Sequence, residues 1–249
     1  MSDRKEPRPA ATVLLVRAAT EGVEVFMVKR PGRGDFPDLH VFPGGKVDAA
    51  DDRIAHACVG LDDAEASAAL GVDGGGLQYW VSAIRECFEE AGVLLAYRDS
   101  GIFAYLDDAH RSRFDEYREA LIDGSLPMVE FLDREQLTLA TDRVLYFSHW
   151  ITPVGAPARF DVRFFITAMP PDQDARGHDW EVVSGEWVRP EAALEHHRAG
   201  RWQMIYPTLT TLASISGHAD VDRLLTRVGA GEHLGDITEE RHIQGMQYR

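Results

Sequence analysis

The 249-residue sequence has few cysteines, no long apolar run and no excess of basic residues. Its two cysteines, Cys58 and Cys87, are too few for a disulfide framework and are not spaced as a C-x-x-C pair. No apolar stretch approaches the ~18 residues that a membrane-spanning helix requires. Residues 1–10 are charged, unlike a signal peptide, and the chain does not end in the peroxisomal Ser-Lys-Leu signal. We therefore expect a cytoplasmic protein without a membrane span.

The charge balance is acidic, with 26 Lys and Arg residues against 41 Asp and Glu residues and a formal net charge of −15. A general nucleic-acid-binding protein needs a basic surface to neutralise phosphates, and anionic membranes also attract basic segments. The composition therefore argues against both partners. An acidic protein can still bind anionic phosphates where it holds divalent cations or concentrates a few Arg residues.

The pattern of apolar residues and turn signals predicts a mixture of strands and helices. Strands are expected at 11–18 and 23–30, which form a hairpin, and at 40–42, 93–97, 144–153, 159–170 and 180–188. Helices are expected at 63–70, 77–91, 190–200, 206–217 and 220–229, and residues 103–140 have a mainly helical pattern. Because strands and helices do not alternate strictly, we expect an α+β fold, an α-β-α sandwich in which helices flank a mixed sheet. Residues 1–249 are expected to form one domain.

The helix expected at 77–91 is amphipathic in an unusual way, because its polar face is acidic. One face carries the apolar residues Val81, Ile84, Phe88 and Ala91, and nearly the opposite face carries Glu86, Glu89 and Glu90. Like charges at this spacing repel, and a bound divalent cation would offset the repulsion. Carboxylates without Cys or paired His favour Mg²⁺ or Mn²⁺ over zinc. Arg85 is placed to orient the Glu89 carboxylate. The alternative is a solvated acidic helix end.

Two segments together resemble a known motif. Residues 42–45 read Phe-Pro-Gly-Gly, and residues 85–93 read Arg-Glu-Cys-Phe-Glu-Glu-Ala-Gly-Val. They are similar to the Nudix box of the Nudix hydrolase family, G-x5-E-x7-R-E-U-x-E-E-x-G-U, in which U is an apolar residue. The resemblance covers most of residues 11–215. It implies the Nudix fold, with a mixed sheet flanked by helices.

The box departs from the family pattern at its first acidic position and in its length. Asp51 stands where the pattern has Glu, and 33 residues (52–84) separate it from Arg85 where the pattern has seven. The interrupted box resembles the branch of the family that includes peroxisomal coenzyme A diphosphatases. The insertion, at about 52–80, leaves the role of Asp51 open. The insertion itself could cap the site, pair protomers in a homodimer, or do neither.

The resemblance implies a metal-dependent hydrolase that cleaves a nucleoside diphosphate linked to another moiety. Glu86, Glu89 and Glu90 match the box glutamates that hold Mg²⁺ or Mn²⁺, and the Gly45 carbonyl is a further expected ligand. Glu181 is expected to complete the metal site, the alternative being an exposed carboxylate at the end of a strand. The general base is expected to be Glu90 or Glu181, and Arg85 belongs to the same catalytic set.

The substrate is less well defined by the sequence. The branch resemblance favours coenzyme A and its acyl thioesters, with ADP-ribose, dinucleotides or dinucleoside polyphosphates as alternatives. A non-catalytic nucleotide-binding module is a third possibility, against which the intact box residues count. Arg30 and Arg33 are placed to contact phosphates, with solvation at the protein surface as the alternative. Four aromatic residues in β-rich runs are candidates for stacking on the adenine base of a substrate: Phe42, Trp150, Trp180 and Trp187. The alternative is that they pack in the core.

Overall fold

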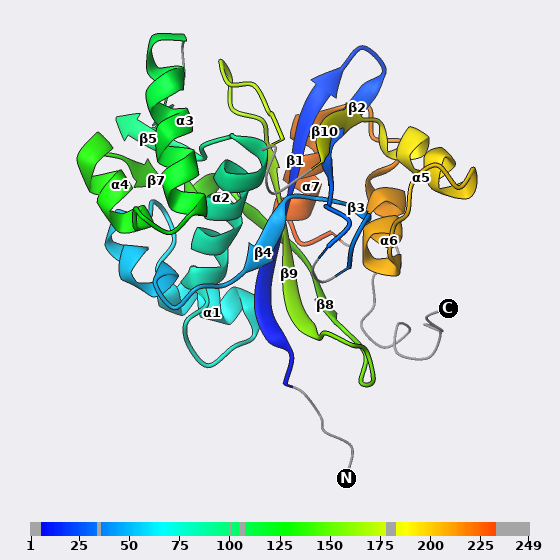
Figure 1. Cartoon of the computed structure of the whole chain (residues 1–249), viewed down its shortest axis with the longest axis horizontal. Coiled ribbons are helices and arrows are strands. Elements are labelled where there is room, and N and C mark those ends of the chain that lie inside the picture. Colours follow the sequence, from blue (N-terminus) through cyan, green and yellow to red (C-terminus); the bar gives the residue numbers. More distant parts are fainter. Residues whose placement is uncertain (1–5, 34–35, 100, 105–107, 178–182, 233–249) are drawn as a thin grey trace.

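A mixed β-sheet forms the centre of the protein. The computed structural model describes residues 6–33, 36–99, 101–104, 108–177 and 183–232 (Figure 1). Its main sheet has the strand order β10-β2-β1-β9-β8, with β3 paired to β2 and β4 paired to β1. These strands span β1 Arg8–Ala19, β2 Gly22–Lys29, β3 His40–Val41, β4 Gly44–Lys46, β8 Leu145–Ile151, β9 Phe160–Ala168 and β10 Ser184–Val188. Because β1 and β9 are parallel and the other pairs antiparallel, the predicted mixed sheet is confirmed.

Helices cover both faces of this sheet (Figure 1). The helices are α1 Asp63–Leu70, α2 Leu77–Ala91, α3 Asp108–Ile122, α4 Met128–Glu135, α5 Pro190–Arg198, α6 Tyr206–Ile215 and α7 Val221–Gly229. Alternate residues of β1 point to opposite faces, so Val13 packs in the core with α2 while Leu14 packs in the core with α6 and α7. Burial on both faces explains why the central strands are continuous apolar runs. The predicted α-β-α sandwich is confirmed.

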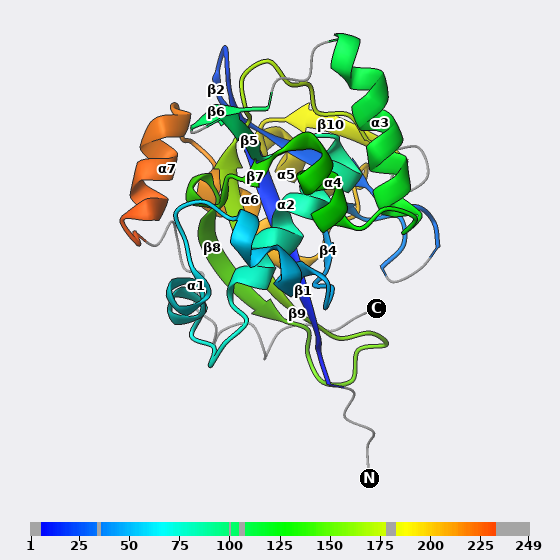
Figure 2. The ribbon, with the colours of Figure 1, turned by 90° about the vertical axis from the view of Figure 1, so that its left-hand side faces the viewer.

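Helix α2 lies at the centre of one covered face, with α1 on one side and α3 and α4 on the other (Figure 2). Its observed bounds match the expected helix 77–91, and Gly92 ends it in the left-handed conformation at φ 67°. Trp80 anchors its first turn to the sheet, because the indole N–H donates to the Val144 carbonyl at 2.8 Å. The apolar face is fully packed, with Ile84 and Phe88 at most 1% exposed.

The insertion in the box packs beside α2. Its 3₁₀ helix, η1 Asp51–Ala57, was not predicted by the sequence pattern, whereas α1 was. The Asp63 carboxylate of α1 accepts the backbone N–H groups of Gly75 and Leu77, both at 3.0 Å, and so caps the start of α2. The insertion therefore supports the helix that carries the acidic face.

The segment at 103–140 is only partly helical. A second, three-stranded sheet has the order β6-β5-β7, formed by β5 Ala96–Asp99, β6 Ile102–Phe103 and β7 Thr138–Leu139. The two ends of the expected helical segment are thus strands, and a short 3₁₀ helix, η2 Thr141–Arg143, follows. The expectation was wrong at these ends because pairing with β5 is a non-local interaction. Among the described residues, no helix is both long and apolar enough to cross a membrane.

Candidate active and metal site

A cleft of about 1100 Å³ opens where β4 meets the C-terminal half of α2. One end is lined by Gly44, Gly45, Arg85, Glu86 and Glu90, and the cleft continues along β8, β9 and the start of α6. No residue of the insertion 52–80 lines it. The insertion therefore does not cap this cleft, which removes one of the three roles considered for it.

The three box glutamates are buried and do not lie in bulk solvent. Glu86 is 8% exposed, and Glu89 and Glu90 are each 7% exposed. A solvated acidic helix end would leave these carboxylates largely exposed, so that alternative is wrong. Burying a carboxylate is costly unless hydrogen bonds or opposite charge compensate for the lost water. The structure must therefore supply partners for all three side chains.

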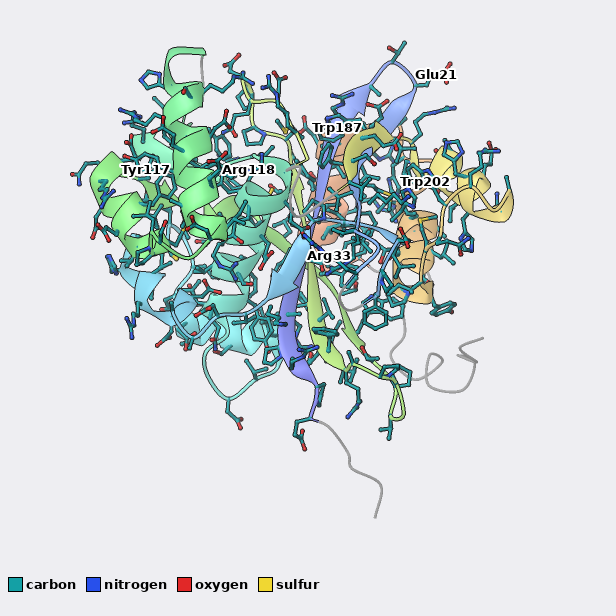
Figure 3. The ribbon with its side chains drawn as sticks, viewed as in Figure 1. Glu21, Arg33, Tyr117, Arg118, Trp187 and Trp202 are labelled. Atoms are coloured by element: carbon teal, nitrogen blue, oxygen red, sulfur yellow. The ribbon has the colours of Figure 1, made fainter. Side chains whose placement is uncertain are left out.

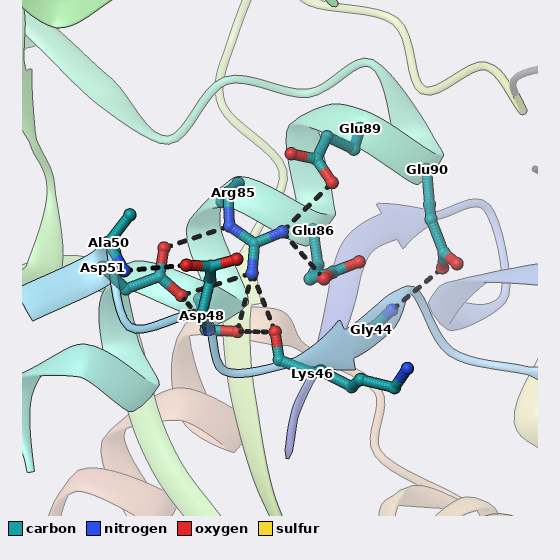
Figure 4. A network of polar contacts seen from close by, with 10 residues as sticks. Gly44, Lys46, Asp48, Ala50, Asp51, Arg85, Glu86, Glu89 and Glu90 are labelled. Atoms are coloured by element: carbon teal, nitrogen blue, oxygen red, sulfur yellow. Dashed lines mark hydrogen bonds and ion pairs between the residues drawn. The ribbon is translucent and has the colours of Figure 1, made fainter. Parts of the chain in front are cut away.

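Arg85 supplies much of that compensation (Figure 4). Its Nη1 donates to Glu86 Oε1 at 2.9 Å and to Glu89 Oε2 at 3.1 Å, so the expected contact between Arg85 and Glu89 is present. Its Nη2 also donates to the Lys46 carbonyl of β4 at 2.8 Å. Burial lowers the pKa of Arg85, but the carboxylates of Glu86, Asp51 and Glu89 outweigh this effect and raise its pKa above the usual range. The guanidinium is therefore a permanent positive charge at the centre of the site.

Asp51, whose role the sequence left open, is part of the same network. Its carboxylate accepts Arg85 Nε at 3.0 Å and Arg85 Nη2 at 3.2 Å, and the side chain is 2% exposed. Burial raises the pKa of Asp51, and the hydrogen bonds and charge of Arg85 oppose that rise. The backbone N–H of Asp48 donates to the same carboxylate at 2.9 Å. Despite the insertion, Asp51 thus lies against the arginine of the box.

The two glycines of the Phe-Pro-Gly-Gly segment allow β4 to approach both β1 and α2. A Cβ on Gly44 would lie 2.5 Å from the Ala11 carbonyl oxygen, and a Cβ on Gly45 would lie 2.3 Å from a Glu86 carboxylate oxygen. The Gly44 N–H donates to Glu90 Oε2 at 2.9 Å. The absence of side chains at these positions therefore lets backbone atoms of β4 contact the acidic face of α2 directly.

The donor set of this site suits a hard divalent cation. Four carboxylates lie here, from Asp51, Glu86, Glu89 and Glu90, and Arg85 contributes one guanidinium. Among the described residues, no three His, Cys, Asp or Glu side chains are already gathered as a metal-binding group. In this arrangement Glu86 and Glu89 turn to Arg85, and Glu90 turns to Gly44. Carboxylate oxygens, with no thiolate or imidazole among these residues, are the ligands that Mg²⁺ and Mn²⁺ prefer.

The other expected site residues differ in their placement. Glu181 and Trp180 lie outside the described residues. Arg30 lines the cleft, and its Nε is buried without a hydrogen-bond partner. Arg33 is exposed and is not among the residues that line the cleft (Figure 3).

The aromatic candidates are mainly core residues. Phe42 and Trp150 line the cleft wall but are only 2% and 6% exposed, so the stacking of a base on either ring stays a prediction. Trp187 does not line the cleft, and its ring packs against Phe26 with centroids 5.3 Å apart. Cys87 is fully buried, and burial raises the pKa of its thiol to about 12, which fits a packing residue.

Two polar contacts near the site were not found from the sequence. Arg118 of α3 is 5% exposed, and its Nε donates to the Glu89 carbonyl at 2.8 Å, where a cation interacts favourably with the C-terminal end of α2. His149 lines the cleft, and its Nε2 lies 2.6 Å from Asp161 Oδ1. Both contacts join residues that are distant in sequence or on different strands, so no local pattern reveals them.

Comparisons with known proteins agree with this architecture. Residues 61–215, more than half of the chain, match the family described as the NUDT19 Nudix domain. The crystal structure of a NUDIX hydrolase from Alicyclobacillus acidocaldarius superimposes with a TM-score of 0.74 at 23% identity, covering 89% of this chain and 96% of that chain. This likeness shows a shared fold, and the expected Nudix fold is confirmed.

Two curated relatives are similar in sequence. A putative nudix hydrolase 7 from Caenorhabditis elegans is 24% identical over 218 residues, which cover 86% of this chain and 62% of that protein. The acyl-coenzyme A diphosphatase NUDT19 of Xenopus laevis is 24% identical over 238 residues, which cover 82% of this chain and 63% of that protein. The chain thus spans less than two thirds of the length of these relatives.

The contacts of Asp51 predict a specific effect of its removal. Asp51→Asn should lower the free energy of unfolding by about 1–3 kcal/mol, because an amide has one acceptor oxygen whereas both carboxylate oxygens accept N–H groups from Arg85 and Asp48 in a buried position. Chemical denaturation in the presence of a chelator measures this. The neighbouring Asp52 is exposed, so Asp52→Asn should change the free energy by no more than about 0.5 kcal/mol. Equal effects of the two substitutions would show that the Asp51–Arg85 contact contributes nothing.

Proposed function

The chain belongs to the Nudix family, in the group described by the NUDT19 Nudix domain, and from that premise we propose that it is a divalent-metal-dependent diphosphate hydrolase. Its proposed substrates are nucleoside diphosphates linked to another moiety, with coenzyme A and its acyl thioesters favoured. One relative is named an acyl-coenzyme A diphosphatase, which supports this choice of substrate. Mg²⁺ or Mn²⁺ is the proposed cofactor.

The observation that carries this proposal is the buried acidic corner of the cleft. Glu86 and Glu90 line the cleft and are 8% and 7% exposed. A diphosphate brings further negative charge to this corner, and like charges in a buried position cannot remain uncompensated. A cation between the carboxylates and the diphosphate resolves this conflict, which is why an acidic cleft supports binding of an anionic substrate.

The side chains have separate proposed roles. Glu86, Glu89, Glu90 and Glu181, with the Gly45 carbonyl, would hold the metal. When bound, a divalent cation supplies electrophilic stabilisation of the phosphate oxygens and lowers the pKa of a coordinated water. Glu90 or Glu181 would accept the proton of the attacking water. Arg85 is a positioning residue, because it holds Glu86 and Glu89 through one shared nitrogen.

The cationic group proposed for substrate binding is Arg30. Its buried Nε without a partner is an energetic cost in the free protein, and a phosphate oxygen of the substrate would remove that cost. Arg33 and the rings of Phe42 and Trp150 are further proposed contacts of the substrate. Arg33 is exposed and does not line the cleft, and both rings are largely buried.

A panel of diphosphate conjugates tests the proposed function. Hydrolysis of coenzyme A should break one P–O bond of the diphosphate and give 3′,5′-ADP and 4′-phosphopantetheine, identified by mass. The panel includes ADP-ribose, dinucleotides and dinucleoside polyphosphates, each assayed with Mg²⁺ and with Mn²⁺. Preferred hydrolysis of one of these would replace the favoured substrate. Binding of a conjugate without turnover would favour a non-catalytic module.

Loss of a box carboxylate should remove metal-dependent turnover. Glu89→Gln and Glu90→Gln should each lower kcat by about 100-fold or more, because an amide oxygen is a weaker ligand than a carboxylate and cannot accept a proton as a base. The matched control is Glu116→Gln on the exposed surface of α3, which should retain wild-type kcat. Near wild-type rates for both box variants would contradict the metal assignment.

Loss of the Arg30 charge should weaken substrate binding more than catalysis. Arg30→Gln should raise KM about 10- to 100-fold with a smaller change in kcat, because a charge-assisted hydrogen bond contributes roughly 1.5–3 kcal/mol. Steady-state kinetics measures both constants. Arg33→Gln serves as the comparison, since Arg33 lies in the same loop but does not line the cleft. A larger KM effect at Arg33 would reverse the assignment.

A further inference from the structure

Exposed apolar side chains gather at the mouth of the cleft. Among the described residues, five large hydrophobic side chains are well exposed: Ile102, Ile151, Val154, Val183 and Tyr206. Ile151 and Val154, 49% and 59% exposed, line the cleft. Tyr206, 43% exposed, stands between the lining residues Ile205 and Pro207, and its ring lies 6.0 Å from that of Trp150. Three of the five therefore belong to one place.

These residues come from two segments that meet across the cleft. Ile151 ends β8, Val154 lies in the turn between β8 and β9, and Tyr206 begins α6. We call the set Ile151, Pro153, Val154, Ile205, Tyr206 and Pro207 the apolar rim. Exposed apolar groups that cluster around a cleft mark a binding surface more often than isolated ones do. The six rim residues carry no formal charge, and the nearby lining residue Arg159 donates its Nε to the Thr152 carbonyl at 3.0 Å.

The two ends of the cleft thus have opposite chemistry. The end at α2 and β4 is lined by Arg85, Glu86 and Glu90, whereas the rim is aliphatic with one phenol. The cleft volume of about 1100 Å³ exceeds what a diphosphate group alone would fill. A ligand that matches both ends has an anionic part joined to a hydrocarbon part. Five of the six rim residues are aliphatic, and such side chains suit a flexible alkyl chain better than a flat base.

We propose that the apolar rim is the subsite for an alkyl or acyl chain attached to the diphosphate conjugate, and that it makes the protein selective for chain-bearing conjugates over unsubstituted ones. This inference rests on the proposed function, because the diphosphate places the conjugate in the cleft. Contact of the chain with Val154 and Ile151 removes apolar surface of both partners from water, and the gain grows with the number of methylene groups that the rim covers.

Binding measurements test the rim without requiring turnover. Calorimetry in the presence of a chelator, so that the diphosphate of neither ligand is cleaved, compares the affinity of coenzyme A with that of its S-octyl thioether. The wild-type protein should bind the thioether about tenfold more tightly, because the chain buries several methylene groups. Val154→Asp should abolish most of this preference, since a carboxylate in the rim must be desolvated when the chain binds. Ile102→Asp, at an exposed position of β6, should preserve it.

The outcomes separate this inference from the proposed function. An equal affinity for the two ligands, or a preference that survives Val154→Asp, would overturn the rim assignment even if coenzyme A is hydrolysed. A preference lost in Val154→Asp would support the rim even if hydrolysis is absent, and the absence of hydrolysis would then count against the proposed function alone. Sedimentation of both proteins completes the test: a wild-type dimer that Val154→Asp dissociates, without a change in ligand preference, would assign the rim to self-association and overturn the proposal.

Discussion

The gathering of buried carboxylates around one guanidinium is the constraint on which this site depends. Asp51, Glu86 and Glu89 all contact Arg85, and Glu90 accepts the Gly44 N–H beside them. Hydrogen bonds and one permanent positive charge hold these four carboxylates in positions that water hardly reaches. A polyanionic substrate that enters this end of the cleft would add further negative charge, which a divalent cation would offset. Such a cation would make an acidic cleft and a polyanionic substrate compatible.

The surrounding fold keeps this charge cluster in place. Glycines at 44 and 45 let β4 pair with β1 and still approach α2, and Arg118 of α3 binds the last turn of α2. The apolar face of α2 is fixed by the core, so the acidic face cannot rotate away from β4. Core packing fixes one face of α2, and hydrogen bonds fix the other. Together they hold the carboxylates in a defined position beside β4.

Local signals predicted much of this arrangement. The bounds of α2 follow from the helical spacing of its apolar residues and from Gly92, which ends the helix. The contact of Arg85 with Glu89 follows from their separation of four residues on a helix. The burial of the glutamates could not be predicted, because an amphipathic pattern assigns a polar face to solvent. The pairing of Asp51 with Arg85 spans 34 positions, and the contact of Arg118 with Glu89 spans 29. Such contacts, like the strands β6 and β7 in the expected helical segment, depend on tertiary structure.

Anomalous diffraction from crystals soaked in Mn²⁺ would locate the cation of this site without reference to turnover. A manganese peak should lie between the backbone of Gly45 and the carboxylates of Glu86 and Glu90, with at least one of these side chains turned from its partner in the metal-free protein. A well-occupied manganese elsewhere in the protein, with Arg85 still holding Glu86 and Glu89 and no peak at β4, would contradict this metal site.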